Sequence, residues 1–237
     1  MVAVLFVVVV ALAMVAVERL APAVQQPHVR GWGWRVAALN AAQVGVVWLG
    51  GVTWDRWLPQ LRLVDGEAFG PVGGVALGYV AITFVYYWWH RARHEVPFLW
   101  RHLHQVHHSP ARIEVLTSFY KHPAEIAANG VLSSAVLYVG LGLDAAQATT
   151  VVAITGVAEL VYHWNVRTPY WLGWFFQRPE MHRRHHERGW HRDNYSDLPL
   201  WDWLFGTYHN PRTTPALCGF ANDRERDLLA LLKGAAK

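Results

Sequence analysis

The chain has 237 residues, of which 53% are hydrophobic and only 16% are charged, and its formal net charge is +4. Soluble domains carry about 25% charged residues, so this composition, with its 14 tryptophans, favours a membrane protein with aromatic residues at the lipid interface. The single cysteine, Cys218, excludes an internal disulfide, a CxxC redox pair and a cysteine-bound iron–sulfur cluster. The basic residues lie in loops beside apolar stretches, which indicates membrane topology rather than nucleic-acid binding.

The apolar stretches predict the helices of an all-α membrane bundle. Residues 2–17 are uncharged, and no basic segment precedes them as in a signal peptide, so we expect a retained membrane helix. A second span is predicted over about 35–54 and a third over about 71–89. At about 1.5 Å per residue, the third span covers roughly the thickness of the hydrocarbon layer.

A fourth apolar stretch, residues 124–162, is too long for one span. Gly140, Gly142 and Asp144 interrupt it, so it predicts a helical hairpin that either crosses the bilayer twice or enters it and returns. Residues 164–237 are polar and rich in arginine, and they predict no further span. The fold class is therefore a bundle of about four to five spans with a histidine-rich helical cap.

The distribution of lysine and arginine predicts the orientation of the bundle. The loops after the first and third spans and the C-terminal tail are rich in basic residues, whereas acidic residues balance Arg56 and Arg62 after the second span. The positive-inside rule then puts all the histidine clusters on the cytoplasmic face, and the N-terminus and the loop 55–70 outside. Five crossings, or three crossings with a re-entrant hairpin, give the same sides.

Eight histidines form three clusters with helical spacing. They are His90 and His94, then His104, His107 and His108, then His182, His185 and His186. In a helix, positions i, i+3 and i+4 share one face, so each cluster directs its imidazoles into one space. A basic surface patch is the ordinary alternative, but three clusters with repeated spacing favour metal ligands.

With His163, which follows the hairpin, nine imidazoles are more than one tetrahedral zinc ion requires, and they indicate two metal ions. Neutral nitrogen ligands suit iron better than magnesium or calcium, which prefer oxygen, and they do not exclude zinc. The H-E-x-x-H motif of zinc metalloproteases is absent. A site at a membrane surface predicts a lipid substrate.

These motifs together resemble the fatty acid hydroxylase/sterol desaturase superfamily of integral-membrane di-iron enzymes. The resemblance covers about residues 86–208 and rests on HRARH, LWRHLHQVHHSP, KHPAE, the single His163, PEMHRRHH and NYSDLPLWDWLFGTY. It implies a four-helix membrane core under a cytosolic histidine-rich cap, two iron ions, and dioxygen as co-substrate. It also implies that the eight clustered histidines and His163 are the metal ligands, with no separate catalytic acid or base.

Other residues have less definite roles. Relatives of the fatty-acyl hydroxylase type have a histidine four residues before the ninth ligand, where this chain has Glu159, so Glu159 is either a ligand or a group that holds one. His122, His191 and Asn194 are further candidates for ligation or support. The aspartates at 193, 197 and 202 could accept imidazole N–H bonds. Trp201, Trp203 and Phe205 are expected to pack the cap or rest on the membrane interface, and His28, His102 and His209 to lie at the surface.

The sequence therefore predicts three parts: N-terminal spans (1–70), a catalytic region (71–210) and a C-terminal cytosolic tail (211–237). The expected protein is a membrane oxidoreductase that hydroxylates or desaturates a sterol, fatty acyl chain, ether lipid or carotenoid. Its reducing power would come from a ferredoxin or a cytochrome b5-like donor that docks on the arginine-rich face. The alternatives are a zinc-dependent membrane hydrolase and a metal-binding membrane protein without catalytic activity.

Overall fold

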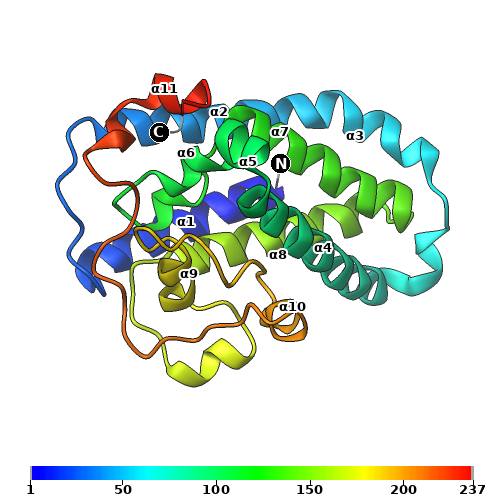
Figure 1. Cartoon of the computed structure of the whole chain (residues 1–237). Helices are drawn as coiled ribbons and strands as arrows, with labels where there is room; N and C mark the ends of the chain where they lie inside the picture. The colour runs from blue at the N-terminus through cyan, green and yellow to red at the C-terminus, as the bar shows by residue number, and fades with distance from the viewer. Residues whose placement is uncertain (1, 236–237) are drawn as a thin grey trace.

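A computed structural model describes residues 2–235, and every regular element in that range is helical, which confirms the predicted all-α class. The long helices run side by side (Figure 1). They are α1 (Val2–Leu20), α2 (Trp32–Val52), α4 (Gly70–Glu95), α7 (Pro123–Ser134), which continues into the π-helix η5 (Ala135–Gly140), and α8 (Ala145–His163). Met1 and the last two residues of the predicted tail lie outside the described range.

The shorter elements lie toward the two ends of this bundle (Figure 1). The connection from α2 to α4, at one end, contains α3 (Trp54–Trp57), η1 (Leu58–Leu61) and η2 (Gly66–Phe69). The remaining elements form what we call the cap, residues 96–122 and 164–235. They are α5 (Pro97–Leu99), η3 (Trp100–His104), α6 (Gln105–His108), η4 (Val115–Thr117), η6 (Tyr170–Trp174), α9 (Pro179–His185), α10 (Pro199–Leu204), η7 (Arg224–Arg226) and α11 (Leu228–Leu232).

The predicted helical hairpin is confirmed and has clear local causes. The turn between η5 and α8 contains Gly142, whose φ of 60° favours glycine. The Asp144 carboxylate then accepts the Gln147 backbone N–H at 2.7 Å, and the Gln147 side chain accepts the Asp144 N–H at 3.0 Å. This reciprocal cap satisfies two N–H groups at the start of α8 and fixes where the helix begins.

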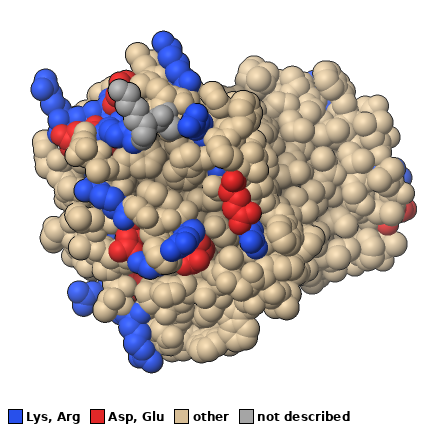
Figure 2. Space-filling view, viewed as in Figure 1, with Lys and Arg blue, Asp and Glu red and all other residues tan. Residues whose placement is uncertain are grey.

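Among the described residues, three helical stretches are long and apolar enough to cross a membrane: Trp32–Leu61, Gly70–Glu95 and Ala145–His163. Figure 2 agrees with this division, because charged side chains gather on the half of the surface that carries the cap, while the half formed by the long helices is almost free of them. The helix α1 is present where a first span was predicted. The number of crossings stays a prediction.

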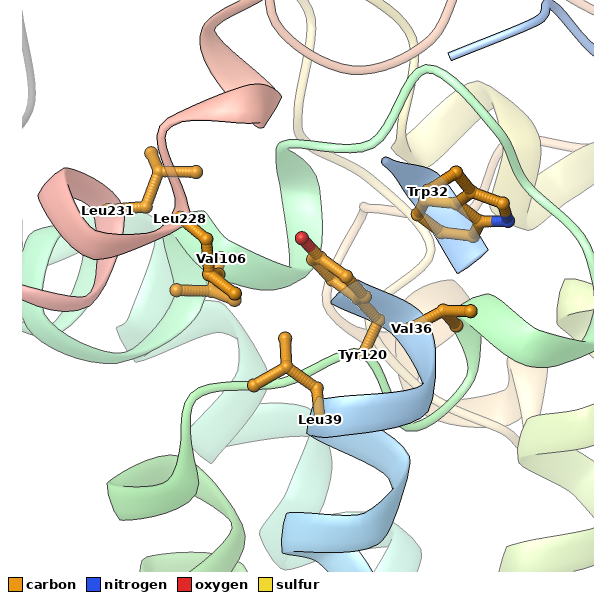
Figure 3. Close-up of a cluster of buried hydrophobic side chains, with 7 residues drawn as sticks. All are labelled: Trp32, Val36, Leu39, Val106, Tyr120, Leu228 and Leu231. Carbon is orange, nitrogen blue, oxygen red and sulfur yellow. The ribbon is translucent and has the colours of Figure 1, made fainter. Parts of the chain in front are cut away.

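One buried cluster packs the bundle, and a second joins the bundle to its cap. Ile82, Leu137 and Val151 pack α4, η5 and α8 against one another within the bundle. The second cluster, shown in Figure 3, contains Trp32, Val36, Leu39, Val106, Tyr120, Leu228 and Leu231. It attaches the C-terminal α11 to α2 and α6, so the C-terminal segment is part of the packed structure.

The core role of α11 gives a direct prediction for stability. Leu231 is 2% exposed within the second cluster, whereas Leu229 on the same helix is 70% exposed. Leu231→Ala should lower the free energy of unfolding by about 2–5 kcal/mol, because it leaves a cavity. Leu229→Ala should change it by less than about 0.5 kcal/mol. Urea titration in mild detergent measures both, and equal losses would show that α11 is not held by this cluster.

Candidate metal centre

The nine histidines singled out in the sequence converge into two groups whose ring nitrogens lie within 4.8 Å of one another. The five-histidine group contains His90, His94, His104, His108 and His185. The four-histidine group contains His107, His163, His182 and His186. Each group draws on distant parts of the chain, so only the folded protein assembles them.

The prediction that each cluster directs its imidazoles into one space is confirmed for His90 and His94 but wrong for the other two clusters, each of which is divided between the two groups. His104 and His108 are four residues apart and face the five-histidine group, while His107 between them turns to the other. In the last cluster, His182 and His186 face the four-histidine group, and His185 between them faces the five-histidine group. His90 and His94 lie on the last turns of α4, and His163 is the last residue of α8.

The Nε2 atoms within each group are close together. His90 Nε2 lies 3.0 Å from His104 Nε2 and 3.3 Å from His94 Nε2. In the four-histidine group, His182 Nε2 lies 3.1 Å from His163 Nε2 and 3.0 Å from His186 Nε2. Two nitrogens bound at right angles to one ion, each at about 2.1 Å, would be about 3.0 Å apart.

Backbone carbonyls orient three of the rings through Nδ1, on the side of each ring that faces away from its group. Nδ1 of His90 donates to the Tyr195 carbonyl at 2.8 Å, and Nδ1 of His185 donates to the Asp193 carbonyl at 2.6 Å. Nδ1 of His163 donates to the Glu159 carbonyl at 2.9 Å. A carbonyl can only accept, so the proton is on Nδ1 and the lone pair is on Nε2, inside the group.

This pattern fits a bound cation in each group. His107 Nδ1 also faces a carbonyl, that of Tyr120 at 3.4 Å, and its Nε2 lies 3.3 Å from His163 Nε2. Both Nε2 atoms carry lone pairs, which repel each other unless a positive charge lies between them. In the five-histidine group, the buried Nε2 of His185 has no hydrogen-bond partner. The donor atoms are neutral nitrogens, as a transition metal prefers.

Burial keeps these imidazoles neutral. Loss of solvation lowers the pKa of His185 to about 3. Burial, followed by the charges of neighbouring histidines, likewise lowers the pKa of His182 and His186 well below the ordinary value of about 6.5. A metal ion would therefore meet free lone pairs at neutral pH and would not have to displace protons.

One carboxylate also supports the site. Glu125 Oε1 lies 3.0 Å from His104 Nδ1 and forms a buried ion pair with Arg93. Arg93 Nη1 is 3.3 Å from the same nitrogen, but the shorter contact to the carboxylate is the stronger one. Glu125 was not predicted from the sequence as a supporting residue, although it lies in the KHPAE motif.

Two of the aspartates proposed for this role, Asp193 and Asp202, act differently. Asp193 uses its backbone carbonyl, while its carboxylate accepts the Trp190 indole N–H at 3.0 Å. Both carboxylate oxygens of Asp202 accept backbone N–H groups, from Tyr195 at 2.7 Å and from Ser196 at 3.0 Å. Asp202 thus fixes the loop whose carbonyls orient His90 and His185, which is a positioning role through the backbone.

The four less definite candidates fall in different places. The Glu159 carboxylate pairs with Lys121 beside the four-histidine group. His191 Nδ1 is 3.2 Å from His108 Nδ1, and Asn194 bridges the carbonyls of Met181 and His209 with its amide at 3.1 and 2.8 Å. His122 belongs to neither group, because its ring caps the start of α7. The side chains of His28, His102 and His209 are exposed, as predicted.

A pocket of about 400 Å³ opens next to the five-histidine group. His94, Pro97, Trp100, Arg101 and His191 line it. It gives this group access from the cap side.

Comparison with known proteins agrees with this geometry. The family model described as "Fatty acid hydroxylase" matches residues 75–207, more than half of the chain. The chain belongs to the fatty acid hydroxylase family. The matched region contains all nine histidines, Glu125 and the loop fixed by Asp202, and it leaves out α1 and α2. The resemblance stated from the motifs is thereby confirmed.

Named relatives of this fatty acid hydroxylase chain act on different lipids. An ornithine lipid hydroxylase of Rhizobium tropici is 36% identical over 142 residues, which are 58% of this chain and 42% of the relative. A very-long-chain aldehyde decarbonylase of Oryza sativa is 35% identical over 161 residues, 62% of this chain and 56% of the relative. A methylsterol monooxygenase of Arabidopsis thaliana is 31% identical over 137 residues, 54% of this chain and 50% of the relative.

The chain thus spans about half the length of the curated relatives it matches. No solved structure matches it. The hydroxylases and monooxygenase among the relatives are oxidoreductases, the enzyme class predicted from the sequence.

The contact between Glu125 and His104 gives a prediction for metal affinity. Glu125→Ala should weaken metal binding about 10–100-fold, because it frees the His104 ring and leaves Arg93 unpaired. Glu125→Gln keeps an acceptor oxygen and should fall in between. Glu95→Ala, which removes an exposed partner of Arg91, is the control. Anaerobic titration with Fe²⁺ measures the affinity, and unchanged binding in Glu125→Ala would contradict the assigned role.

Proposed function

We propose that this chain binds one iron ion in each histidine group and uses dioxygen to hydroxylate or desaturate a lipid. The observation that carries the proposal is that nine imidazoles, seven of them buried, bring their ring nitrogens together in two groups. All-nitrogen ligation suits iron, and the family membership supports an oxygenase. Residues 71–210 would then form the catalytic region, with 1–70 and 211–237 flanking it.

When bound, iron would supply the dioxygen chemistry needed to oxidise an unreactive carbon–hydrogen bond. The protein's own groups would do the rest. The Asp193 and Tyr195 carbonyls and the Glu125 carboxylate hold the rings in one orientation, so little reorganisation is needed when the ions bind. Burial of the four-histidine group keeps bulk water away from its side of the site.

A lipid substrate follows from where the ligands lie. Three of them, His90, His94 and His163, are at the ends of α4 and α8, which are long and apolar enough to span a bilayer. A lipid chain could therefore reach the site without leaving an apolar environment. Sterols, fatty acyl chains, ether lipids and carotenoids are all compatible substrate classes.

The reaction needs electrons from another protein, and we propose a ferredoxin or a cytochrome b5-like donor. The charged side chains gather on the cap half of the surface (Figure 2). The pocket beside His94 opens there, with Arg101 in its lining. An acidic donor would be attracted to this arginine-bearing surface close to the five-histidine group.

Replacing one of the predicted ligand histidines should abolish both metal binding and product formation. His107→Ala or His186→Ala should lose bound iron and abolish lipid oxidation, because each removes a buried ligand and leaves the long helices intact. His28→Ala and His209→Ala are matched controls, since both rings are exposed. Metal analysis of the purified protein should find about two irons per chain. Lipidomics of a host with wild type or His186→Ala identifies the product.

Two results would contradict this proposal. One zinc ion per chain, with no iron uptake after anaerobic iron loading, would favour a zinc-dependent hydrolase, which needs no dioxygen. Equal damage from His209→Ala and His186→Ala would show that the ligand set is wrong.

We also propose that the histidine groups face the cytoplasm. Single cysteines at Ala221 in the cap and at Asp144 in the hairpin turn, in a Cys218→Ser background, test this in sealed cells. An impermeant thiol reagent added outside should miss position 221, because the basic loops keep the cap inside. It should reach position 144 only if the hairpin crosses fully. External labelling of position 221 would refute the orientation and with it a cytosolic electron donor.

A further inference from the structure

The cap carries an exposed aromatic surface that the proposed reaction does not use. It comes from two segments of the cap, η6 with its following turn and α10. We call it the aromatic platform, and it consists of Trp171, Trp174, Phe175, Phe176, Trp203 and Leu204. Each of these side chains is between 49% and 63% exposed. So many large apolar side chains facing outward in one place require a partner that removes them from water.

The platform is one surface, because its two segments are in contact. The rings of Trp174 and Trp203 lie 5.2 Å apart at a steep angle. Tyr208 packs against both rings, and its hydroxyl donates to the Gly173 carbonyl at 3.1 Å. These contacts hold the two segments at a fixed relative position.

The platform also continues onto a helix that is able to span the membrane. Next to it on α10, the Trp201 indole N–H donates to Thr83 Oγ1 on α4 at 3.0 Å, and its ring lies 4.9 Å from Phe84. Phe205, which follows α10, lies 4.7 Å from Trp88 on α4. Phe84 and Trp88 are themselves 38% and 42% exposed. A run of exposed rings therefore leads from α4 to the platform.

The charge pattern of the platform matches a lipid boundary. The stretch 169–177 contains no charged residue, and in 198–208 the one charge, Asp202, is buried under its hydrogen bonds. At the margin, the guanidinium of Arg212 lies over the Tyr170 ring at 4.5 Å. Tryptophan on the apolar side and arginine at the margin are the side chains that prefer the headgroup region of a bilayer.

We propose that the aromatic platform inserts into the headgroup region of the bilayer that α4 crosses. The cap would then bind the membrane directly, in addition to its connection to the membrane helices. Trp88 lies seven residues before the end of α4, about 10 Å along the helix axis, which is a depth typical of interfacial aromatic residues. A second copy of the chain is a less suitable partner. It would have to cover the platform while lipid covers the adjoining Phe84 and Trp88 on the same run of rings.

The platform is linked directly to the histidine groups. Asp202 on α10 accepts the Tyr195 N–H, and the Tyr195 carbonyl accepts from His90. Binding of α10 to the membrane would therefore fix the distance between the five-histidine group and the lipid surface. The binding of the platform to lipid requires neither metal nor turnover and stands apart from the proposed reaction.

Fluorescence from lipid-facing labels tests this inference. Phe175→Cys and Trp203→Cys, each in a Cys218→Ser background, are labelled with the environment-sensitive NBD fluorophore and reconstituted into phosphatidylcholine–phosphatidylglycerol vesicles. Ala221→Cys, an exposed position elsewhere in the cap, is the matched control. Nitroxide lipids spin-labelled at the headgroup should quench both platform labels several-fold more than the control. They should also quench these labels more than lipids that carry the nitroxide at the chain end.

Three outcomes would overturn the inference. Quenching equal to that of Ala221→Cys would mean that the platform faces water. A blue-shifted emission that neither nitroxide lipid quenches would mean that protein covers it. Stronger quenching by the chain-end nitroxide would place it in the hydrocarbon layer instead of the interface. Phe176→Cys gives a second probe if labelling at Phe175 disturbs the fold, and circular dichroism checks each variant.

Discussion

The structure depends on one constraint, the confinement of nine neutral imidazoles with their lone pairs directed at one another. Such an arrangement is repulsive without a cation, and each ring could relieve it by turning away. For three of the rings the protein prevents this, because the carbonyls at 159, 193 and 195 accept from Nδ1 of His163, His185 and His90 and keep each Nε2 turned into its group. The same acceptors fix the tautomer, so ring orientation and ligand chemistry have a single cause.

Much of the centre could be predicted because helical periodicity is visible in a sequence. Histidines four residues apart share a face if the segment is helical, and each such pair lies in one group, whereas His107 and His185, at the i+3 positions, turn to the other group. The hairpin was predictable because glycine and aspartate interrupt an apolar run that is too long for one span. In both cases the information needed for the prediction lies in a few residues that are close together in the sequence.

Other features were not visible because they depend on the tertiary structure or on the backbone. To predict that the histidines of one cluster divide between two groups, one must know which helices pack opposite that cluster. Glu125 is 21 residues from His104, and apart from its place in the KHPAE motif nothing distinguishes it from a surface glutamate on a helix. The carbonyls of Asp193 and Tyr195 carry no side-chain signature at all. The sequence directed attention to the aspartate carboxylates in the same loop, whereas Asp202 acts by binding the loop's N–H groups.

The two groups are unequal, and the cause lies on α8. His90 with His94, His104 with His108, and His182 with His186 are each pairs four residues apart that face one group. On α8 the residue four before His163 is Glu159, whose carboxylate is held by Lys121. The four-histidine group therefore has one nitrogen donor fewer than its neighbour. Under the proposed function, an ion in this group would keep more positions for ligands from outside the protein. Lys121 has a definite role here, because its ammonium neutralises the partly buried Glu159 carboxylate.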